Sequence, residues 1–260
     1  MQMPPNLQKI MIAIGFLSRL PVPKSVWTDF DGRVATTAHL FPLAGLVIAL
    51  PAAFTLWLLM ALDADPLVAA VVALGVLTLT TGALHEDGLA DCADGFGGGA
   101  SRDRALEIMK DSRIGTYGAI ALILSFGLRI ATLSTLATEL SPLAAAAIFA
   151  AIAPLSRAMM VTHWQALPSA RANGTAVSAG QPDVFIGALA LATGTVLSGI
   201  LLIAALSFAA LLLTLVAMAI ATTLMSRRAT SKIGGHTGDT IGATEQVCEM
   251  AGLLALSLLV

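Results

Sequence analysis

Long apolar stretches separated by short polar segments form the main pattern of this chain. A transmembrane helix needs about 20 mostly apolar residues. The windows that we interpret as spans are residues 38–62, 66–84, 115–136, 142–163, 185–226 and 241–260. The stretch 185–226 is too long for one helix, because 42 residues at about 1.5 Å each would reach about 63 Å, twice the hydrocarbon core of about 30 Å. We therefore expect two spans here with a turn near Ser207, which makes about seven spans in all.

The apolar stretch nearest the N-terminus, residues 7–20, is too short to span a bilayer and is followed by Pro21 and Pro23. We interpret it as a short interfacial or re-entrant helix. Because Arg19 and the prolines stand where a small-residue cleavage site would be, we expect no cleaved signal peptide. No internal repeat or flexible linker divides the chain, so the prediction is one all-α polytopic membrane domain over residues 1–260.

Composition agrees with a membrane protein and excludes two other classes. Hydrophobic residues make up 57% of the chain and charged residues only 12%. An ordinary soluble domain carries about 25% charged residues, so a soluble enzyme and a disordered chain are both excluded. The net charge of −2 gives no support for a nucleic-acid partner, which would require a basic surface. Cys92 and Cys248 are too few for a disulfide framework, and we expect them to pack between helices.

Basic residues alternate along the predicted topology. Of the 14 Lys and Arg residues, 12 lie in four polar segments, residues 1–37, 85–114, 164–184 and 227–240, whereas the turns between these segments have none. Because cytoplasmic connections carry an excess of Lys and Arg, we predict a cytoplasmic N-terminus and an outside C-terminus. The two exceptions, Arg129 and Arg157, lie inside predicted spans. Arg157 is near enough to the cytoplasmic end to snorkel, while the sequence offers no account of Arg129.

Three aspartates follow the second predicted span. If the helix continues through Asp94, Asp87, Asp91 and Asp94 fall within a sector of about 60°, while Glu86 points elsewhere. Such carboxylates repel one another by a few kcal/mol per close pair at an effective dielectric of about 20, and a bound cation would neutralise them. All-oxygen ligands favour Mg²⁺ or Mn²⁺, so we predict these three aspartates as metal ligands. The alternative is that they are solvated carboxylates on a helix end that leaves the bilayer.

A glycine run, residues 95–99, comes next, and Ser101 is expected to cap a helix through Lys110. A glycine-rich loop at a helix N-terminus can present backbone N–H groups to a phosphate. The basic residues that we predict to bind a diphosphate group beside the metal are Arg102, Arg104, Lys110 and Arg113. The alternative is that they only reflect the positive charge of cytoplasmic segments.

A second polar cluster, residues 232–245, precedes the last window. Its glycines allow close approach of the backbone, and Glu245 shares a helix face with Glu249 but not with Asp239. We interpret the cluster as a second half-site that closes over the first at the cytoplasmic edge. The alternative is a re-entrant turn with capping residues. His85 and His236 flank the two clusters and are candidate hydrogen-bond partners of a phosphate group.

Three segments resemble the cobalamin synthase family, the adenosylcobinamide-GDP ribazoletransferases. They are residues 15–23 (GFLSRLPVP), His85 to Gly95 together with Met109 to Gly118, and Gly234 to Ala243, in the family's order along nearly the whole chain. The resemblance implies a Mg²⁺-dependent, multi-pass enzyme of the bacterial inner membrane. It implies that the enzyme joins adenosylcobinamide-GDP to α-ribazole, or to its 5′-phosphate, and releases GMP. Its partners would be corrinoid and nucleoside small molecules and the lipid bilayer, and a homo-oligomer is left open.

The chemistry that the resemblance implies assigns roles to the polar residues. Attack of a ribose hydroxyl on the cobinamide-side phosphorus requires a metal to neutralise the pyrophosphate and little covalent help from the protein. Asp94 and Asp239 are the candidate catalytic residues, with Asp239 either completing the metal shell or accepting the hydroxyl proton. Glu245 joins the histidines and basic residues as a candidate for substrate binding.

Two other functions remain as alternatives. A lipid phosphotransferase of the CDP-alcohol type uses similar chemistry, but Asp91 stands where that family's pattern requires arginine. A secondary transporter would place polar residues near the bilayer midplane, whereas the two clusters lie at one edge of the predicted spans.

Overall fold

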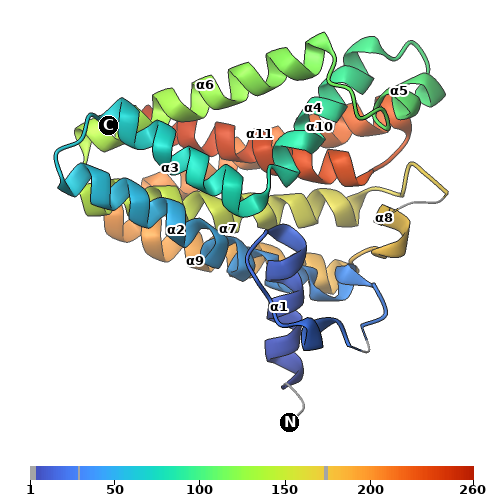
Figure 1. Ribbon diagram of the computed structural model, residues 1–260, viewed down its shortest axis with the longest axis horizontal. Coiled ribbons are helices and arrows are strands. Elements are labelled where there is room, and N and C mark those ends of the chain that lie inside the picture. Colours follow the sequence, from blue (N-terminus) through green and yellow to red (C-terminus); the bar gives the residue numbers. More distant parts are fainter. Residues whose placement is uncertain (1–3, 29, 173–174) are drawn as a thin grey trace.

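The computed structural model describes residues 4–28, 30–172 and 175–260, and helices dominate it (Figure 1). The α-helices are α1 (Pro5–Leu17), α2 (Phe41–Ala61), α3 (Pro66–Thr81), α4 (Leu84–Gly98), α5 (Arg102–Ile108), α6 (Thr116–Glu139), α7 (Pro142–Ala166), α8 (Thr175–Ser178), α9 (Val184–Ala205), α10 (Phe208–Ile233) and α11 (Gly238–Ser257). Two 3₁₀ helices, η1 (Lys24–Trp27) and η2 (Val34–Leu40), lie between α1 and α2. Over the described residues the only β-type pairing is one bridge between Ser169 and His236. The predicted all-α class is confirmed.

Most of the predicted spans correspond to single helices. Within the part of the chain that the structure describes, five helical segments are long and apolar enough to cross a membrane: Val34–Ala61, α6, α7, α9 and α10. The predicted turn near Ser207 is confirmed, because Ser207 precedes α10 and its hydroxyl accepts a hydrogen bond from the N–H of Ala210 at 3.2 Å. The protein is therefore a multi-pass membrane protein.

The predicted span 66–84 does not continue without a break through Asp94. α3 ends at Thr81, α4 begins at Leu84, and the two helices meet at 89°. Gly82 and Ala83 both have positive φ, 67° and 58°, and this left-handed backbone stops α3. The 16 residues of α3 extend only about 24 Å, so α3 and α4 together form at most one broken span.

The last predicted span, 241–260, corresponds to α11. This helix is more polar than the five segments, and it packs among α4, α6, α7 and α10 with most of its residues buried. The described residues thus contain five span candidates, or six if α3 and α4 count as one. The count of seven is not confirmed.

α7 forms the centre of the bundle. It packs against α2, α9, α10 and α11, and nearly all of its residues between Ala145 and Trp164 are buried. Its many alanines let neighbouring backbones approach closely, as small residues do in membrane bundles. Gly194 on α9 shows how closely: a Cβ there would lie 2.6 Å from the Cβ of Ala158 on α7.

The basic segments that follow α3, α7 and α10 lie at one end of the bundle, on the right of Figure 1, away from the turn between α2 and α3, and the N-terminal segment runs from α1, below the bundle, toward the same end. The N–H of Ala35 donates to the carbonyl of Ala179 at 2.9 Å, which links the N-terminal segment to the segment after α7. The Arg102 guanidinium donates to the carbonyls of Ala170 at 2.6 Å and Ile233 at 3.0 Å, which links the remaining two segments. The contacts between these segments agree with the prediction that every second connection carries the basic residues and lies on one side of the membrane.

Candidate active site

The three aspartates of α4 all lie on the helix, as predicted, but they have different surroundings. Asp87 is exposed and Asp91 half-buried, and both line a pocket of 500 Å³. Asp94 is buried and caps α6, because its two carboxylate oxygens accept hydrogen bonds from the N–H groups of Gly115 at 2.7 Å and Gly118 at 2.8 Å. Asp94 therefore satisfies backbone donors that a helix N-terminus leaves free.

Asp239 lies on the first turn of α11, which packs directly on α4. A Cβ at Gly88 would lie 2.7 Å from the carbonyl oxygen of Asp239, so only glycine permits this contact. Asp239 and Asp87 contribute most to the negative charge that acts on Asp91. The two polar clusters of the sequence thus pack against each other. The capping alternative also holds, since Thr237 and Thr240 form a capping box at the start of α11.

The carboxylates that remain suit a magnesium ion bound together with a substrate. Among the described residues, no three His, Cys, Asp or Glu side chains come together as a preformed metal site, so the predicted three-aspartate cage is not formed. Mg²⁺ is usually held by one or two carboxylates, several waters and the substrate's phosphates. Asp87 and Asp91, two oxygen donors on one pocket wall, fit that mode. Asp94 does not, because its oxygens are directed at the α6 backbone.

Three of the four basic residues that were predicted to bind a diphosphate line the pocket of Asp87 and Asp91 or the pocket next to it. Lys110 and Arg113 line the same pocket as Asp87 and Asp91. Arg113 also lines an adjoining pocket of 390 Å³ with Arg104. Hydrogen bonds from Arg113 lower the pKa of the exposed Asp111 carboxyl to about 2. These side chains place positive charge beside the carboxylates, which suits a diphosphate.

One prediction about this segment is wrong, and Arg102 lies apart from the other three basic residues. Arg102 lines neither pocket, because its guanidinium holds the carbonyls of Ala170 and Ile233. The glycine run is not a phosphate-binding loop, because α4 continues through Gly98 and its N–H groups bond within the helix. Gly97 instead allows close packing, since a Cβ there would lie 2.7 Å from the ring of Tyr117. The Ser101 cap is confirmed, although its helix ends at Ile108.

Arg171 is a site residue that the sequence pattern did not single out. Its Nη2 lies 3.8 Å from Oδ2 of Asp239 and donates to the carbonyl of Leu106 at 3.2 Å. It is the only Lys or Arg residue in the segment 164–184. Its charge is visible in the sequence, but the sequence does not show which residue it contacts. The structure puts it against α11, where it supplies the positive charge nearest to Asp239.

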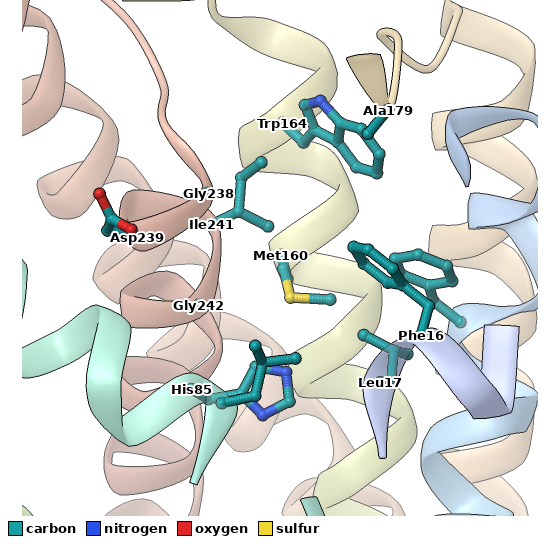
Figure 2. Close-up of a pocket in the computed structure, with 12 residues that line it drawn as sticks. Phe16, Leu17, His85, Met160, Trp164, Ala179, Gly238, Asp239, Ile241 and Gly242 are labelled. Carbon is teal, nitrogen blue, oxygen red and sulfur yellow. The ribbon is translucent and has the colours of Figure 1, made fainter. Parts of the chain in front are cut away.

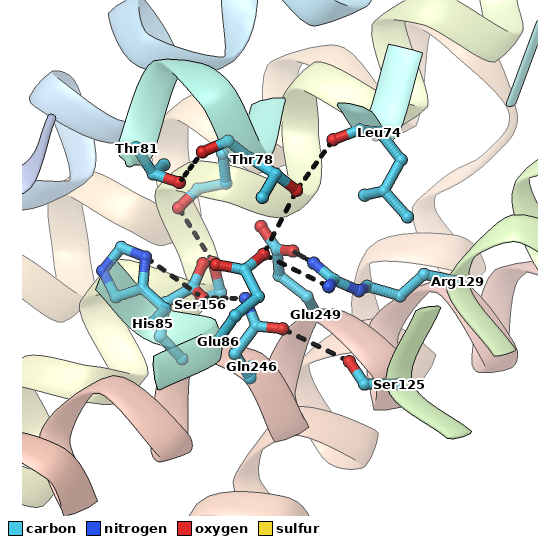
Figure 3. A network of polar contacts seen from close by, with 12 residues as sticks. Leu74, Thr78, Thr81, His85, Glu86, Ser125, Arg129, Ser156, Gln246 and Glu249 are labelled. Carbon is cyan, nitrogen blue, oxygen red and sulfur yellow. Dashed lines mark hydrogen bonds and ion pairs between the residues drawn. The ribbon is translucent and has the colours of Figure 1, made fainter. Parts of the chain in front are cut away.

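A network of buried charges lies beneath the aspartates, where α4, α6, α7 and α11 meet (Figure 3). Arg129 contacts Glu249 at 3.0 Å and Glu86 at 3.2 Å, and its side chain is 1% exposed. Thr78 of α3 donates a hydrogen bond to Glu86 at 3.5 Å. These contacts explain why an arginine lies inside a predicted span, and why Glu86 points away from the three aspartates of α4.

Arg157 and Glu245 complete this network. Arg157 contacts Glu245 at 2.7 Å and Glu249 at 3.3 Å, and it is 1% exposed, so the snorkelling interpretation is wrong. Glu245 also accepts hydrogen bonds from Ser156 at 3.0 Å and Gln246 at 3.1 Å. Glu245 is therefore a partner of buried groups and has no free carboxylate for the substrate contact that was predicted.

A cavity of 290 Å³ lies on the other side of α11, between α1 and α7 (Figure 2). Aromatic side chains of three helices line it, Phe16, Phe41 and Trp164, and His85 and Asp239 are its titratable residues. His85 is buried, and its Nδ1 lies 3.7 Å from Oε2 of Glu245. His85 thus connects the charge network to the cavity.

His236 lies outside this cavity, in the turn before α11. Its N–H donates to the carbonyl of Pro168 at 2.8 Å, and its own carbonyl accepts from the N–H of Ala170 at 2.8 Å. Burial lowers the pKa of His236 to about 4. Among the described residues neither ring nitrogen has a hydrogen-bond partner, and its predicted contact with a phosphate stays a prediction.

The sequence matches the family described as cobalamin-5-phosphate synthase over residues 9–257. The chain belongs to that family. It is 51% identical over 245 residues to an adenosylcobinamide-GDP ribazoletransferase of Rhizobium etli (strain CIAT 652), with 94% of each chain covered. It is 49% identical over 247 residues to the protein of that name from Sinorhizobium medicae, with 95% of this chain and 94% of the relative covered. No solved structure matches the chain.

The contact of α4 with α11 gives the first testable prediction for this cobalamin-5-phosphate synthase family member. Gly88→Ala should lower turnover by about 10²-fold, because the added methyl group displaces Asp239 from Asp91 and small misplacements in an active site have effects of that size. Gly75→Ala is the matched control, since a Cβ at Gly75 meets no atom within 4 Å. Both variants are measured by product formation at saturating substrate. Equal rates for the two variants would contradict the proposed pairing of the helices in the site.

Proposed function

We propose that this chain is an adenosylcobinamide-GDP ribazoletransferase, which joins adenosylcobinamide-GDP to α-ribazole or α-ribazole 5′-phosphate and releases GMP. The observation that carries the proposal is about 50% identity to enzymes of that name over 94% of the chain. The site supports it independently, because carboxylates and basic side chains line one pocket at the basic end of the bundle. Neither the lipid phosphotransferase nor the transporter gains support from the comparisons.

The reaction in this proposal is a direct displacement at phosphorus. A ribose hydroxyl oxygen of the acceptor attacks the cobinamide-side phosphorus, a new O–P bond forms, and the bond to the GMP oxygen breaks. Asp239 accepts the hydroxyl proton, and Arg171 beside it stabilises the carboxylate before the transfer. Lys110, Arg113 and Arg104 balance the charge of the GDP group.

Asp87 and Asp91 are the residues that would hold Mg²⁺ in this proposal. The ion would supply positive charge to the pyrophosphate, whose negative charge otherwise repels both the nucleophile and the carboxylates. Without a bound ion these aspartates would face the same phosphates as like charges, so the basic side chains would have to offset both.

Membrane orientation is part of the same proposal. We place the N-terminus and the active site on the cytoplasmic side of the bacterial inner membrane and the C-terminus outside. The convergence of four Lys- and Arg-bearing segments at one end of the bundle supports this orientation.

The test is GMP release by purified, detergent-solubilised protein given adenosylcobinamide-GDP and α-ribazole. We expect GMP only when the acceptor and Mg²⁺ are both present, and none in EDTA. Parallel reactions with α-ribazole 5′-phosphate identify the preferred acceptor. Absence of GMP with either acceptor, from protein that elutes as a folded species in size-exclusion chromatography, would contradict the transferase function.

A further inference from the structure

The cavity between α1, α7 and α11 has walls that suit a flat, apolar ring (Figure 2). The rings of Phe16 and Phe41 stack with centroids 6.0 Å apart, and Phe41 lies 6.3 Å from Trp164. Met160 and Ile241 add apolar surface between them. Aromatic and thioether side chains in such an arrangement bind aromatic ligands by stacking and by apolar burial.

Two residues that line this cavity each have a buried nitrogen without a partner among the described residues: Nε2 of His85 and Nε1 of Trp164. Both side chains are 2% exposed. A carboxylate beside Nδ1 of His85, that of Glu245, favours the tautomer with the proton on Nδ1, so Nε2 is left as an acceptor. The indole N–H of Trp164 can only donate. Buried polar groups are normally hydrogen-bonded, so His85 is the cavity residue with an unused acceptor, whereas the indole nitrogen of Trp164 lies on the edge of its ring away from Met160 and Ile241 (Figure 2).

We propose that this cavity binds the acceptor nucleoside, with its aromatic base among Phe16, Phe41, Trp164 and Met160 and its ribose toward His85 and Asp239. This inference rests on the proposed transferase function. The base of α-ribazole is a dimethylbenzimidazole, two fused rings with two methyl groups and one ring nitrogen free to accept a hydrogen bond. The indole ring of Trp164 supplies an apolar face for this base, and a ribose hydroxyl donates to His85.

Size and polarity distinguish this ligand from the other substrate. Pockets for drug-sized ligands span about 300–1,000 Å³, so a cavity of 290 Å³ holds a two-ring base and excludes a corrin macrocycle. Guanine is also a two-ring base, but its several donors and acceptors would remain unpaired against these apolar walls. Unpaired buried polar groups are strongly unfavourable, so the cavity disfavours guanine.

The position of the cavity places the nucleoside next to the reacting groups. Asp239 lies at its edge, with its carboxylate directed away from the aromatic side chains (Figure 2). On the far side of Asp239, α11 packs on α4 at Gly88, between Asp87 and Asp91. A base in the cavity therefore leaves its ribose at Asp239, between the acceptor pocket and the proposed metal ligands.

The inference also explains the N-terminal segment that carries the family resemblance. Phe16 and Leu17 at the end of α1 form one wall of the cavity. The N–H of Arg19 donates to the carbonyl of Thr80 at 2.8 Å, so the segment is tied to the α3–α4 bend that also positions His85. The role of α1 is thus to close the acceptor site.

The test changes the width of the cavity and measures acceptor selectivity. Ile241→Phe should lower kcat/KM for dimethylbenzimidazole riboside about tenfold more than kcat/KM for unmethylated benzimidazole riboside. The reason is that one carbon too many in a filled apolar pocket lowers kcat/KM by about 10-fold or more. The KM for adenosylcobinamide-GDP should stay unchanged. Ile220→Phe is the matched control, since Ile220 is 55% exposed on α10, away from the cavity.

Met160→Ala changes the cavity in the opposite direction, and it tests the proposal independently if Ile241→Phe does not fold. It widens the cavity and should shift the selectivity ratio toward the dimethylated acceptor. In EDTA, where no turnover occurs, equilibrium dialysis should show weaker binding of α-ribazole to Ile241→Phe than to Ile220→Phe. Equal losses for both acceptors, or a raised KM for adenosylcobinamide-GDP alone, would overturn the assignment. A wild-type protein that releases no GMP would instead contradict the transferase function.

Discussion

Replacing Arg129 by methionine should lower the free energy of unfolding by about 3–5 kcal/mol, the usual effect of removing one partner from a buried ion pair. Glu86 would keep only the hydroxyl of Thr78, at 3.5 Å, while Glu249 would keep Arg157 at 3.3 Å. A buried carboxylate without a positive partner is strongly unfavourable. The measurement is thermal or denaturant unfolding in detergent, followed by circular dichroism.

The matched control is Arg104→Met, which removes an arginine from an exposed pair. Arg104 contacts Glu107 at 2.7 Å, with both side chains more than half exposed. Exposed pairs contribute about 0–1 kcal/mol, so this variant should be nearly as stable as the wild type. The double variant Arg129→Met/Glu86→Gln should recover part of the loss. A stability of Arg129→Met equal to that of Arg104→Met would show that the network does not stabilise the bundle.

Asp91→Asn should lower kcat by about 10³-fold in the proposed transferase. Neutralising the developing charge with a metal is worth several kcal/mol, and each 1.36 kcal/mol corresponds to a factor of ten in rate. The variant keeps the shape of the side chain but removes the negative charge that would hold Mg²⁺ beside Asp87. GMP release as a function of Mg²⁺ concentration measures both the rate and the metal dependence.

Asp63→Asn makes the same chemical change in the exposed turn between α2 and α3 and should leave both quantities unchanged. Asp94→Asn should behave differently from either variant. It removes one acceptor for the N–H groups at the start of α6, so we expect a loss of about 1 kcal/mol of stability with the Mg²⁺ dependence retained. Unchanged turnover and Mg²⁺ dependence in Asp91→Asn would show that the metal assignment is wrong.

Much of the architecture was predictable because membrane insertion depends on local composition. The boundaries of α7 and the turn at Ser207 both follow from the length of apolar stretches, since about 20 apolar residues span the hydrocarbon core. The Ser101 cap follows from the same kind of short-range rule, a hydroxyl at the start of a helix. The placement of Asp87 and Asp91 on one helix required only the helical period.

What the tertiary structure alone decided concerns contacts between residues far apart in the chain. Arg129 pairs with Glu86 across 43 positions and with Glu249 across 120 positions, and no local pattern links them. The bend at Gly82 and the turning of Asp94 toward α6 likewise depend on which helices pack together. By itself the sequence determined five of the apolar helices and which polar clusters the chain carries, because hydropathy and helical period are local properties. Tertiary packing decided which of those polar groups face a pocket and which neutralise each other inside the bundle, because the energy of a buried charge depends on the partners that the fold places beside it.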